Sequence, residues 1–217
     1  MAEKNVKQVP VVDFAVLGEE YYVTDYIQVD NPRLQEVAAK LKGKTAMETV
    51  GKVNRYVARK LTYPMDRRGR PNASRHVKVF KYWNGLYHHD PGEERYGWLL
   101  PNQTLKIKYG ICFDSSCLAT TLLRILGLEA YTVLGAVFKT RTGKLLSFHA
   151  WTEVAVDGEK YVLETTVHPK PAPIVKAQLL YNGKFPVTYD PIAWFNESEW
   201  REDAEKAARY EAMIYGK

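Results

Sequence analysis

The sequence predicts an α+β fold in which helices come first and an antiparallel sheet follows. Three observations support this prediction. Two amphipathic patterns with helical spacing occupy 32–41 and 46–61. A short apolar helix is expected over 110–127, between two glycines. Strand-like segments then flank Asp157-Gly158, a strong hairpin turn signal. A chain of 217 residues is most simply a single domain.

Residues typical of helix N-termini support the two front helices, which are those predicted over 32–41 and 46–61. Asn31-Pro32 is typical of an N-cap followed by a first helical residue, and Gly43 ends that helix. Thr45 and Glu48 form a capping box before apolar residues at 3-4-4 spacing. Upstream, β-branched and aromatic residues favour strands over 10–16 and 21–29.

Residues 62–100 mix basic, aromatic, glycine and proline residues without a sustained period. This stretch is too long for a simple connecting loop in a compact domain, so we expect that it forms a substrate groove or lid, or is partly disordered. Basic and aromatic residues over 66–83 would also suit a nucleic acid, but no recognised nucleic-acid motif accompanies them. The net charge of +6 mildly favours acidic partners, but a basic solvated surface without such a partner is the favoured explanation.

The apolar helix over 110–127 begins at Cys112 and carries only two charges, Asp114 and Arg124. A helix N-terminus favours an anion, which would favour a thiolate at Cys112. The alternative is that Cys112 only fills apolar space. Cys117 points about 140° away on the same helix, so a disulfide is not expected. A short helix over 101–108 precedes this segment.

The second half of the sequence predicts three consecutive strands, over 130–138, 145–156 and 160–166. Five prolines over 167–195 indicate irregular cover with a short strand. An Asn-x-x-Glu box at Asn196 indicates a charged helix that runs to about Tyr215.

The hairpin places a histidine and an acid together. A two-residue turn at Asp157-Gly158 sets residue 156 opposite 159 and His149 opposite Thr166. Glu164 then lies on the same sheet face, diagonal to His149 and within reach of it. If the helix N-terminus packs on that face, Cys112 meets the second imidazole nitrogen, which is the arrangement of nucleophile, base and orienting acid.

Two other acids and a zinc site are the alternatives to these roles. Glu153 shares the His149 face but would stand about 13 Å along the strand, and Asp114 is expected to cap the first helical turn. A zinc site made of Cys112, Cys117, His149 and His168 does not fit, because structural zinc cysteines are two to four residues apart on a turn. We therefore predict no metal and no cofactor.

Three blocks of the sequence resemble the transglutaminase-like superfamily of papain-type cysteine enzymes. These are Gly110-x-Cys112-x-Asp114 with its following helix, His149-Ala150-Trp151-x-Glu153, and Tyr161-x-Leu163-Glu164-x-Thr166. The resemblance is closest to prokaryotic-type transglutaminase-like cysteine proteases. It spans about 45–167 and implies a papain-like core there, whose central helix starts at the nucleophilic cysteine and packs on an antiparallel sheet that carries the histidine and the acid.

The resemblance also implies roles for single residues. Cys112 would be the nucleophile, His149 the general base and acid, and Glu164 the third member, where the family usually has Asp. Some prokaryotic relatives bind calcium at an acid just before the cysteine, and Ile111 at that position argues against such a site. The Cys112 N–H would donate to the oxyanion, together with Trp98 or Gln103. We expect Trp83 and Trp151 to line the substrate groove.

These features predict acyl transfer from an amide through a thioester, with hydrolysis of a peptide or isopeptide bond favoured. A protein-glutamine transglutaminase that uses an amine acceptor is the main alternative, and a non-catalytic binding module on the same fold is another. The expected partner is a peptide, protein or cell-wall amide. No apolar run long enough for a membrane span occurs, and a polar start without an apolar signal core indicates a cytoplasmic protein.

Overall fold

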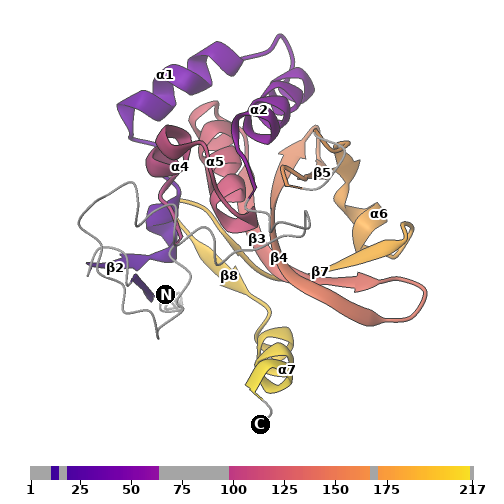
Figure 1. Ribbon diagram of the computed structural model, residues 1–217. Helices are drawn as coiled ribbons and strands as arrows, with labels where there is room; N and C mark the ends of the chain where they lie inside the picture. The colour runs from indigo at the N-terminus through magenta and orange to yellow at the C-terminus, as the bar shows by residue number, and fades with distance from the viewer. Residues whose placement is uncertain (1–10, 15–18, 64–97, 167–170, 216–217) are drawn as a thin grey trace, which may run out of the picture.

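A six-stranded antiparallel sheet with a helix packed on it organises the structure. The computed structural model describes residues 11–14, 19–63, 98–166 and 171–215 (Figure 1). The strand order is β6-β5-β4-β3-β7-β8. In chain order the strands of this sheet are β3 (Ala130–Lys139), β4 (Lys144–Val156), β5 (Glu159–Leu163), β6 (Val175–Lys176), β7 (Val187–Phe195) and β8 (Trp200–Glu202).

Helix α5 (Cys112–Ile125) packs against β3 and β4, and three further helices surround it on that side of the sheet (Figure 1). They are α1 (Pro32–Leu41), α2 (Ala46–Lys60) and α4 (Pro101–Ile107). Both predicted front helices are confirmed, with Asn31 and Thr45 as their N-caps, but the Glu48 carboxylate accepts the Lys44 N–H at 2.7 Å in place of the Thr45 N–H of the predicted capping box. Asn31 Oδ1 accepts from the Arg33 and Leu34 N–H groups, and Thr45 Oγ1 accepts from the Glu48 N–H at 3.1 Å.

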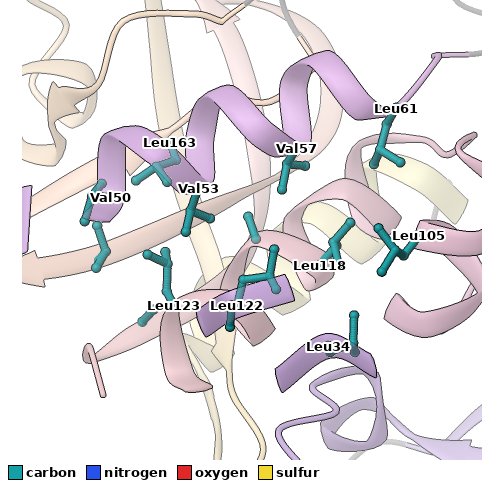
Figure 2. Close-up of a cluster of buried hydrophobic side chains, with 14 of the residues drawn as sticks. Leu34, Val50, Val53, Val57, Leu61, Leu105, Leu118, Leu122, Leu123 and Leu163 are labelled. Atoms are coloured by element: carbon teal, nitrogen blue, oxygen red, sulfur yellow. The ribbon is translucent and has the colours of Figure 1, made fainter. Parts of the chain in front are cut away.

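The main core lies between α2, α5 and the sheet. Figure 2 shows Val50, Val53 and Val57 of α2 pointing from one side of this cluster, and Leu122 of α5 and Leu163 of β5 completing it. All five are completely buried. Each buried aliphatic side chain contributes about 1.5–3 kcal/mol relative to an exposed one, so this contact fixes the position of α5.

The predicted hairpin is confirmed. Asp157 and Gly158 both have positive φ values, of 52° and 78°, as a two-residue type I′ turn requires. Val156 pairs with Glu159, and the register continues to the Thr152–Leu163 pair, where β5 ends.

Of the two amino-terminal strand predictions, the one over 10–16 is confirmed for the described residues 11–14, and the one over 21–29 needs correction. The chain forms a short hairpin of β1 (Val11–Phe14) and β2 (Glu19–Tyr22), and a 3₁₀ turn, η1 (Val23–Tyr26), replaces most of the strand predicted over 21–29. The cause is local, because the Asp25 carboxylate accepts the Tyr22 N–H at 2.8 Å and closes a turn.

For the described residues 171–195, the prediction of irregular cover with a short strand missed most of the regular structure. Besides α6 (Ala177–Tyr181), this region supplies β7, which pairs with β3 in the middle of the sheet. Pro191 is tolerated there because the pairing register shifts at Leu134/Gly135, so that the proline lies at a bulge.

The C-terminal helix was predicted to start too early. Asn196 Oδ1 accepts the Ser198 and Glu199 N–H groups, but this turn leads into β8 and not into a helix. The last helix, α7 (Ala204–Tyr215), begins after Asp203, whose carboxylate accepts the Lys206 N–H at 3.1 Å.

Candidate active site

Cys112 is the first residue of α5, and a buried aspartate fixes that helix end. Asp114 Oδ2 accepts the Ile111 N–H and its Oδ1 accepts the Leu99 N–H, both at 2.8 Å. The Asp114 side chain is completely buried. Burial raises the pKa of Asp114 to about 7, against the opposing effect of the two N–H donors. Asp114 therefore caps the helix start as predicted, and it ties the Leu99 segment to the residue before Cys112.

His149 joins Glu164 and Cys112. Its Nε2 lies 2.9 Å from Glu164 Oε1, and the imidazole lines the same pocket as Cys112, close enough for the thiol to raise the pKa of His149. Burial lowers the pKa of His149, but the charge of Glu164 and the contact with Cys112 outweigh it, and the net pKa is well above the usual range. This arrangement stabilises an imidazolium next to the thiol, which is the geometry that activates a cysteine nucleophile.

The route by which Cys112 reaches His149 differs from the prediction. Helix α5 packs on the sheet face that carries Ala150 and Thr152, whose hydroxyl donates to the Ser116 carbonyl. His149 points to the opposite face, where its ring packs edge-on against Tyr189. Pairing between β4 and β5 stops at the Thr152–Leu163 pair. Cys112, at the N-terminal end of α5, meets the imidazole beyond this last pair of the two strands.

Tyr189 is a site residue that the sequence did not reveal. Its hydroxyl donates to Glu164 Oε1 at 3.1 Å, the same oxygen that contacts His149. Glu164 Oε2 is buried and has no hydrogen-bond partner among the described residues. Burial and the Glu164 charge raise the pKa of Tyr189, so it is a neutral donor. The sequence contained no indication of this role, because Tyr189 lies on β7, in a region that was not predicted to join the sheet.

A pocket of about 370 Å³ opens beside Cys112 and His149. Its other walls are mainly apolar and come from the segment before α4 and from α5, β3, β4, β7, β8 and α7. They include Trp98, Phe148, Ile192, Trp200, Ala207 and Tyr210. The space beside Cys112 and His149 is therefore bounded mainly by apolar side chains.

Of the remaining predicted site residues, some line the pocket and others do not. Trp98 lines the pocket with its ring stacked on Phe113 at 3.9 Å between centroids, and its role as an oxyanion donor stays a prediction. Gln103 lies outside the pocket lining, and its Oε1 accepts the Leu100 N–H as the cap of α4. Trp83 lies outside the described residues.

Trp151 does not line a groove, and that prediction is corrected. Its side chain is completely buried, and its indole N–H donates to the Tyr181 hydroxyl at 3.1 Å. Glu153 does not contact His149. Its carboxylate accepts from the same Tyr181 hydroxyl and pairs with Lys160.

Cys117 is completely buried, and the Thr132 hydroxyl donates to its sulfur at 3.9 Å. It is therefore a core residue directed away from the site. His168, the fourth member of the rejected zinc set, lies outside the described residues. Across the ranges that the structure describes, no three His, Cys, Asp or Glu side chains are grouped to share a metal ion. Within the same ranges, none of the helices has the length and apolar character needed to cross a membrane.

A family model described as a transglutaminase-like domain matches residues 32–181. The chain belongs to the transglutaminase-like family. The match includes α5, the β3–β5 sheet and therefore Cys112, His149 and Glu164. The α+β architecture is the transglutaminase-like, papain-type fold, and family membership supports cysteine-based catalysis in general.

This transglutaminase-like chain is similar to proteins of differing length. It is 26% identical to the UPF0252 protein MJ1282 of Methanocaldococcus jannaschii over 154 residues, which cover 68% of this chain and only 39% of that protein. A provisionally assigned cysteine protease of Cytophaga hutchinsonii is 18% identical with a TM-score of 0.43, over 82% of this chain and 52% of that one. LapG of Legionella pneumophila is 16% identical with a TM-score of 0.38, over 84% of this chain and 94% of LapG.

Proposed function

We propose that this protein is a cysteine hydrolase that cleaves a peptide or isopeptide bond through a thioester on Cys112. One observation carries the proposal, namely that His149 is held by the Glu164 carboxylate and lines the same pocket as Cys112. Because Nε2 of His149 is held by Glu164, Nδ1 is the ring nitrogen that would exchange a proton with the thiol.

The reaction has two halves. His149 takes the thiol proton, and the thiolate attacks the amide carbonyl to form a tetrahedral oxyanion. His149 then donates that proton to the leaving nitrogen, the C–N bond breaks, and an amine departs from the thioester. Water, deprotonated by the same imidazole, attacks the thioester and releases the acid and the thiol. Glu164 stabilises the imidazolium and holds the ring in orientation throughout.

The pocket beside Cys112 supports a substrate with an apolar or aromatic group next to the scissile carbonyl. Peptides, proteins and cell-wall amides all offer such groups. Whether water or an amine resolves the thioester decides between a hydrolase and a transglutaminase, so the experiment must offer both acceptors.

A panel of peptide, isopeptide and cell-wall amides, with and without a primary amine, would be incubated with the wild type, Cys112→Ala and His149→Ala, and products read by mass spectrometry. Cys117→Ala is the matched cysteine control. We expect hydrolysis by the wild type and Cys117→Ala only. Products joined to the amine, without hydrolysis, would instead show a transglutaminase.

Labelling with iodoacetamide near neutral pH tests the nucleophile without a substrate. We expect Cys112 to react faster than a free cysteine, and His149→Ala to slow this reaction. If Cys112 labels no faster than free cysteine and His149→Ala leaves the rate unchanged, the catalytic proposal is wrong and a binding module becomes the better description.

A further inference from the structure

Glu202 is the one acid among the described residues that line the pocket of about 370 Å³ at the candidate active site. It lies on β8 and pairs with Ala193 of β7, which belongs to the same lining. Side chains alternate along a strand, so Glu202 shares the face that borders the pocket with Trp200. Arg201, between them, points to the other face, where its guanidinium carbon lies 4.4 Å from the centre of the Tyr131 ring.

The neighbouring cations are engaged by another acid. Lys206 Nζ lies 2.6 Å from Asp190 Oδ1, and Arg209 Nη2 lies 3.0 Å from Asp190 Oδ2. The start of α7 is capped by Asp203, so Glu202 is not needed as its cap. Within the described part of the chain, the half-buried Glu202 carboxylate has neither an ion pair nor a hydrogen bond. The pocket therefore contains a negative charge without a partner.

Aromatic rings form much of the remaining wall. Phe148 and Tyr210 meet edge-on with their ring centroids 5.8 Å apart, and Trp200 stacks on Phe195 at 6.1 Å. The faces of aromatic rings attract cations, and the aliphatic stems of lysine and arginine pack well on apolar surfaces. A pocket with aromatic walls and an unpaired carboxylate thus suits an aliphatic chain that ends in a positive charge.

We propose that Glu202 is a specificity-determining residue, which selects substrates with a cationic side chain, of the lysine or arginine type, next to the scissile carbonyl. The inference rests on the proposed function and names its substrate class. The stem of that side chain packs on the aromatic walls, and its charged end pairs with Glu202. The charge of His149 does not cancel this preference, because His149 is itself paired with Glu164 at 2.9 Å. No covalent bond to Glu202 forms or breaks.

Two matched thiol reagents test the proposal without requiring amide cleavage. Both are iodoacetamides with the same alkyl chain on the amide nitrogen, which ends in trimethylammonium in one and in tert-butyl, a neutral group of the same shape, in the other. The measured quantity is the ratio of the cationic to the neutral labelling rate of Cys112, because a change in the thiol itself affects both rates alike. We expect the wild-type ratio to exceed that of free cysteine by about tenfold.

Variants of Glu202 identify the source of this preference. We expect Glu202→Gln to lower the ratio to that of free cysteine, and Glu202→Lys to lower it further. Glu205→Gln removes an exposed acid in the first turn of α7, outside the pocket lining, and is the matched control that should keep the wild-type ratio. The melting temperature of each variant reports whether it is folded.

The outcomes separate the proposals. A wild-type ratio no higher than that of free cysteine overturns the inference, and so does a raised ratio that survives in both Glu202 variants. An equal fall in Glu205→Gln would trace the preference to the general field of this surface and also overturn it. If the wild type cleaves no amide yet loses its raised ratio in the Glu202 variants, the hydrolase proposal fails while the role of Glu202 stands. Cleavage of peptides with no preference for lysine over norleucine would leave the hydrolase proposal standing and remove Glu202 from specificity.

Discussion

Glu164 reaches His149 across a diagonal of the sheet, with Oε1 2.9 Å from Nε2. Glu164 follows the last residue of β5, and in the register of the hairpin it lies opposite Trp151 and not opposite His149. A glutamate, one methylene longer than aspartate, spans this offset. The length of the side chain is therefore part of the geometry that joins the two residues.

The charge of Glu164 is predicted to set the alkaline limit of activity. Amide cleavage needs the His149 imidazolium to protonate the leaving nitrogen, and Glu164 raises the pKa of that imidazolium. Glu164→Gln removes the charge, so the His149 pKa falls and the imidazolium is lost at lower pH. We expect the descending limb of the kcat/KM profile to move toward acid, and kcat/KM at pH 8 to fall by about tenfold or more.

Glu159→Gln is the control for this profile, because Glu159 pairs with Lys176 at the exposed start of β5, away from His149. Its profile should match that of the wild type. A Glu164→Gln profile with an unchanged descending limb would mean that His149 does not depend on Glu164 for its charge.

The Tyr189 hydroxyl is predicted to support the carboxylate. Tyr189→Phe keeps the ring that packs against His149 and Trp151 but leaves Glu164 Oε1 without one of its two donors. Loss of a hydrogen bond to a buried charged group costs about 1.5–3 kcal/mol. Chemical denaturation should show a destabilisation of this size, with kcat lowered by up to about tenfold.

Tyr131→Phe offers a comparison, because the Tyr131 hydroxyl also donates to a glutamate, Glu199, but away from the pocket. It should lower stability without lowering kcat. If Tyr189→Phe affects stability alone as well, Tyr189 supports the fold and not the reaction.

The parts of the structure that depend on interactions between residues close together in the sequence were predictable. Asn31 and Thr45 mark helix starts through bonds within three residues, and Asp157-Gly158 sets a hairpin register by its turn type. That register was enough to place Glu164 against His149. The pairing of β7 with β3 was not predictable, because Pro191 argues against a strand until the bulge that accommodates it is known.

The alternation of side chains along a strand also did not show which elements cover each face of the sheet. His149 and Trp151 alternate onto the same face, so the sequence could not distinguish a groove residue from a core residue. The face that carries Trp151 is covered by Tyr181 and Tyr189, both from the region that was predicted to be irregular. Helix α5 lies on the other face, and only the tertiary packing shows that its first residue still meets His149.

Asp114 is predicted to make stability fall as pH rises. Its pKa is about 7 in the folded protein and near 4 in an unfolded chain, so the folded state binds the proton more tightly. Stability is thus highest below pH 4 for this group, declines between about pH 4 and pH 7, and then levels off. Asp114→Asn cannot titrate, and the difference in unfolding free energy between wild type and variant should shrink by roughly 4 kcal/mol across that window.

Urea denaturation at several pH values measures this difference. Asp30→Asn, which changes an exposed aspartate before α1, controls for the general effect of removing a negative charge. A difference between wild type and Asp114→Asn that is constant with pH would show that Asp114 is ionised throughout, with the Leu99 and Ile111 N–H groups holding its charge.

The apolar pocket is predicted to select the group that accompanies the scissile carbonyl. Ala207 of α7 lines the pocket, and α7 is fixed to β7 because the Tyr210 hydroxyl donates to Asp190 at 2.6 Å. Ala207→Trp therefore fills the pocket without freeing the helix. We expect a bulky N-aryl iodoacetamide to label Cys112 about tenfold more slowly in this variant, and iodoacetamide itself to react at the wild-type rate. Ala208→Trp, on the exposed side of α7, is the matched control and should react with both reagents as the wild type does. Equal labelling of Ala207→Trp by both reagents would show that substrates approach Cys112 from another direction.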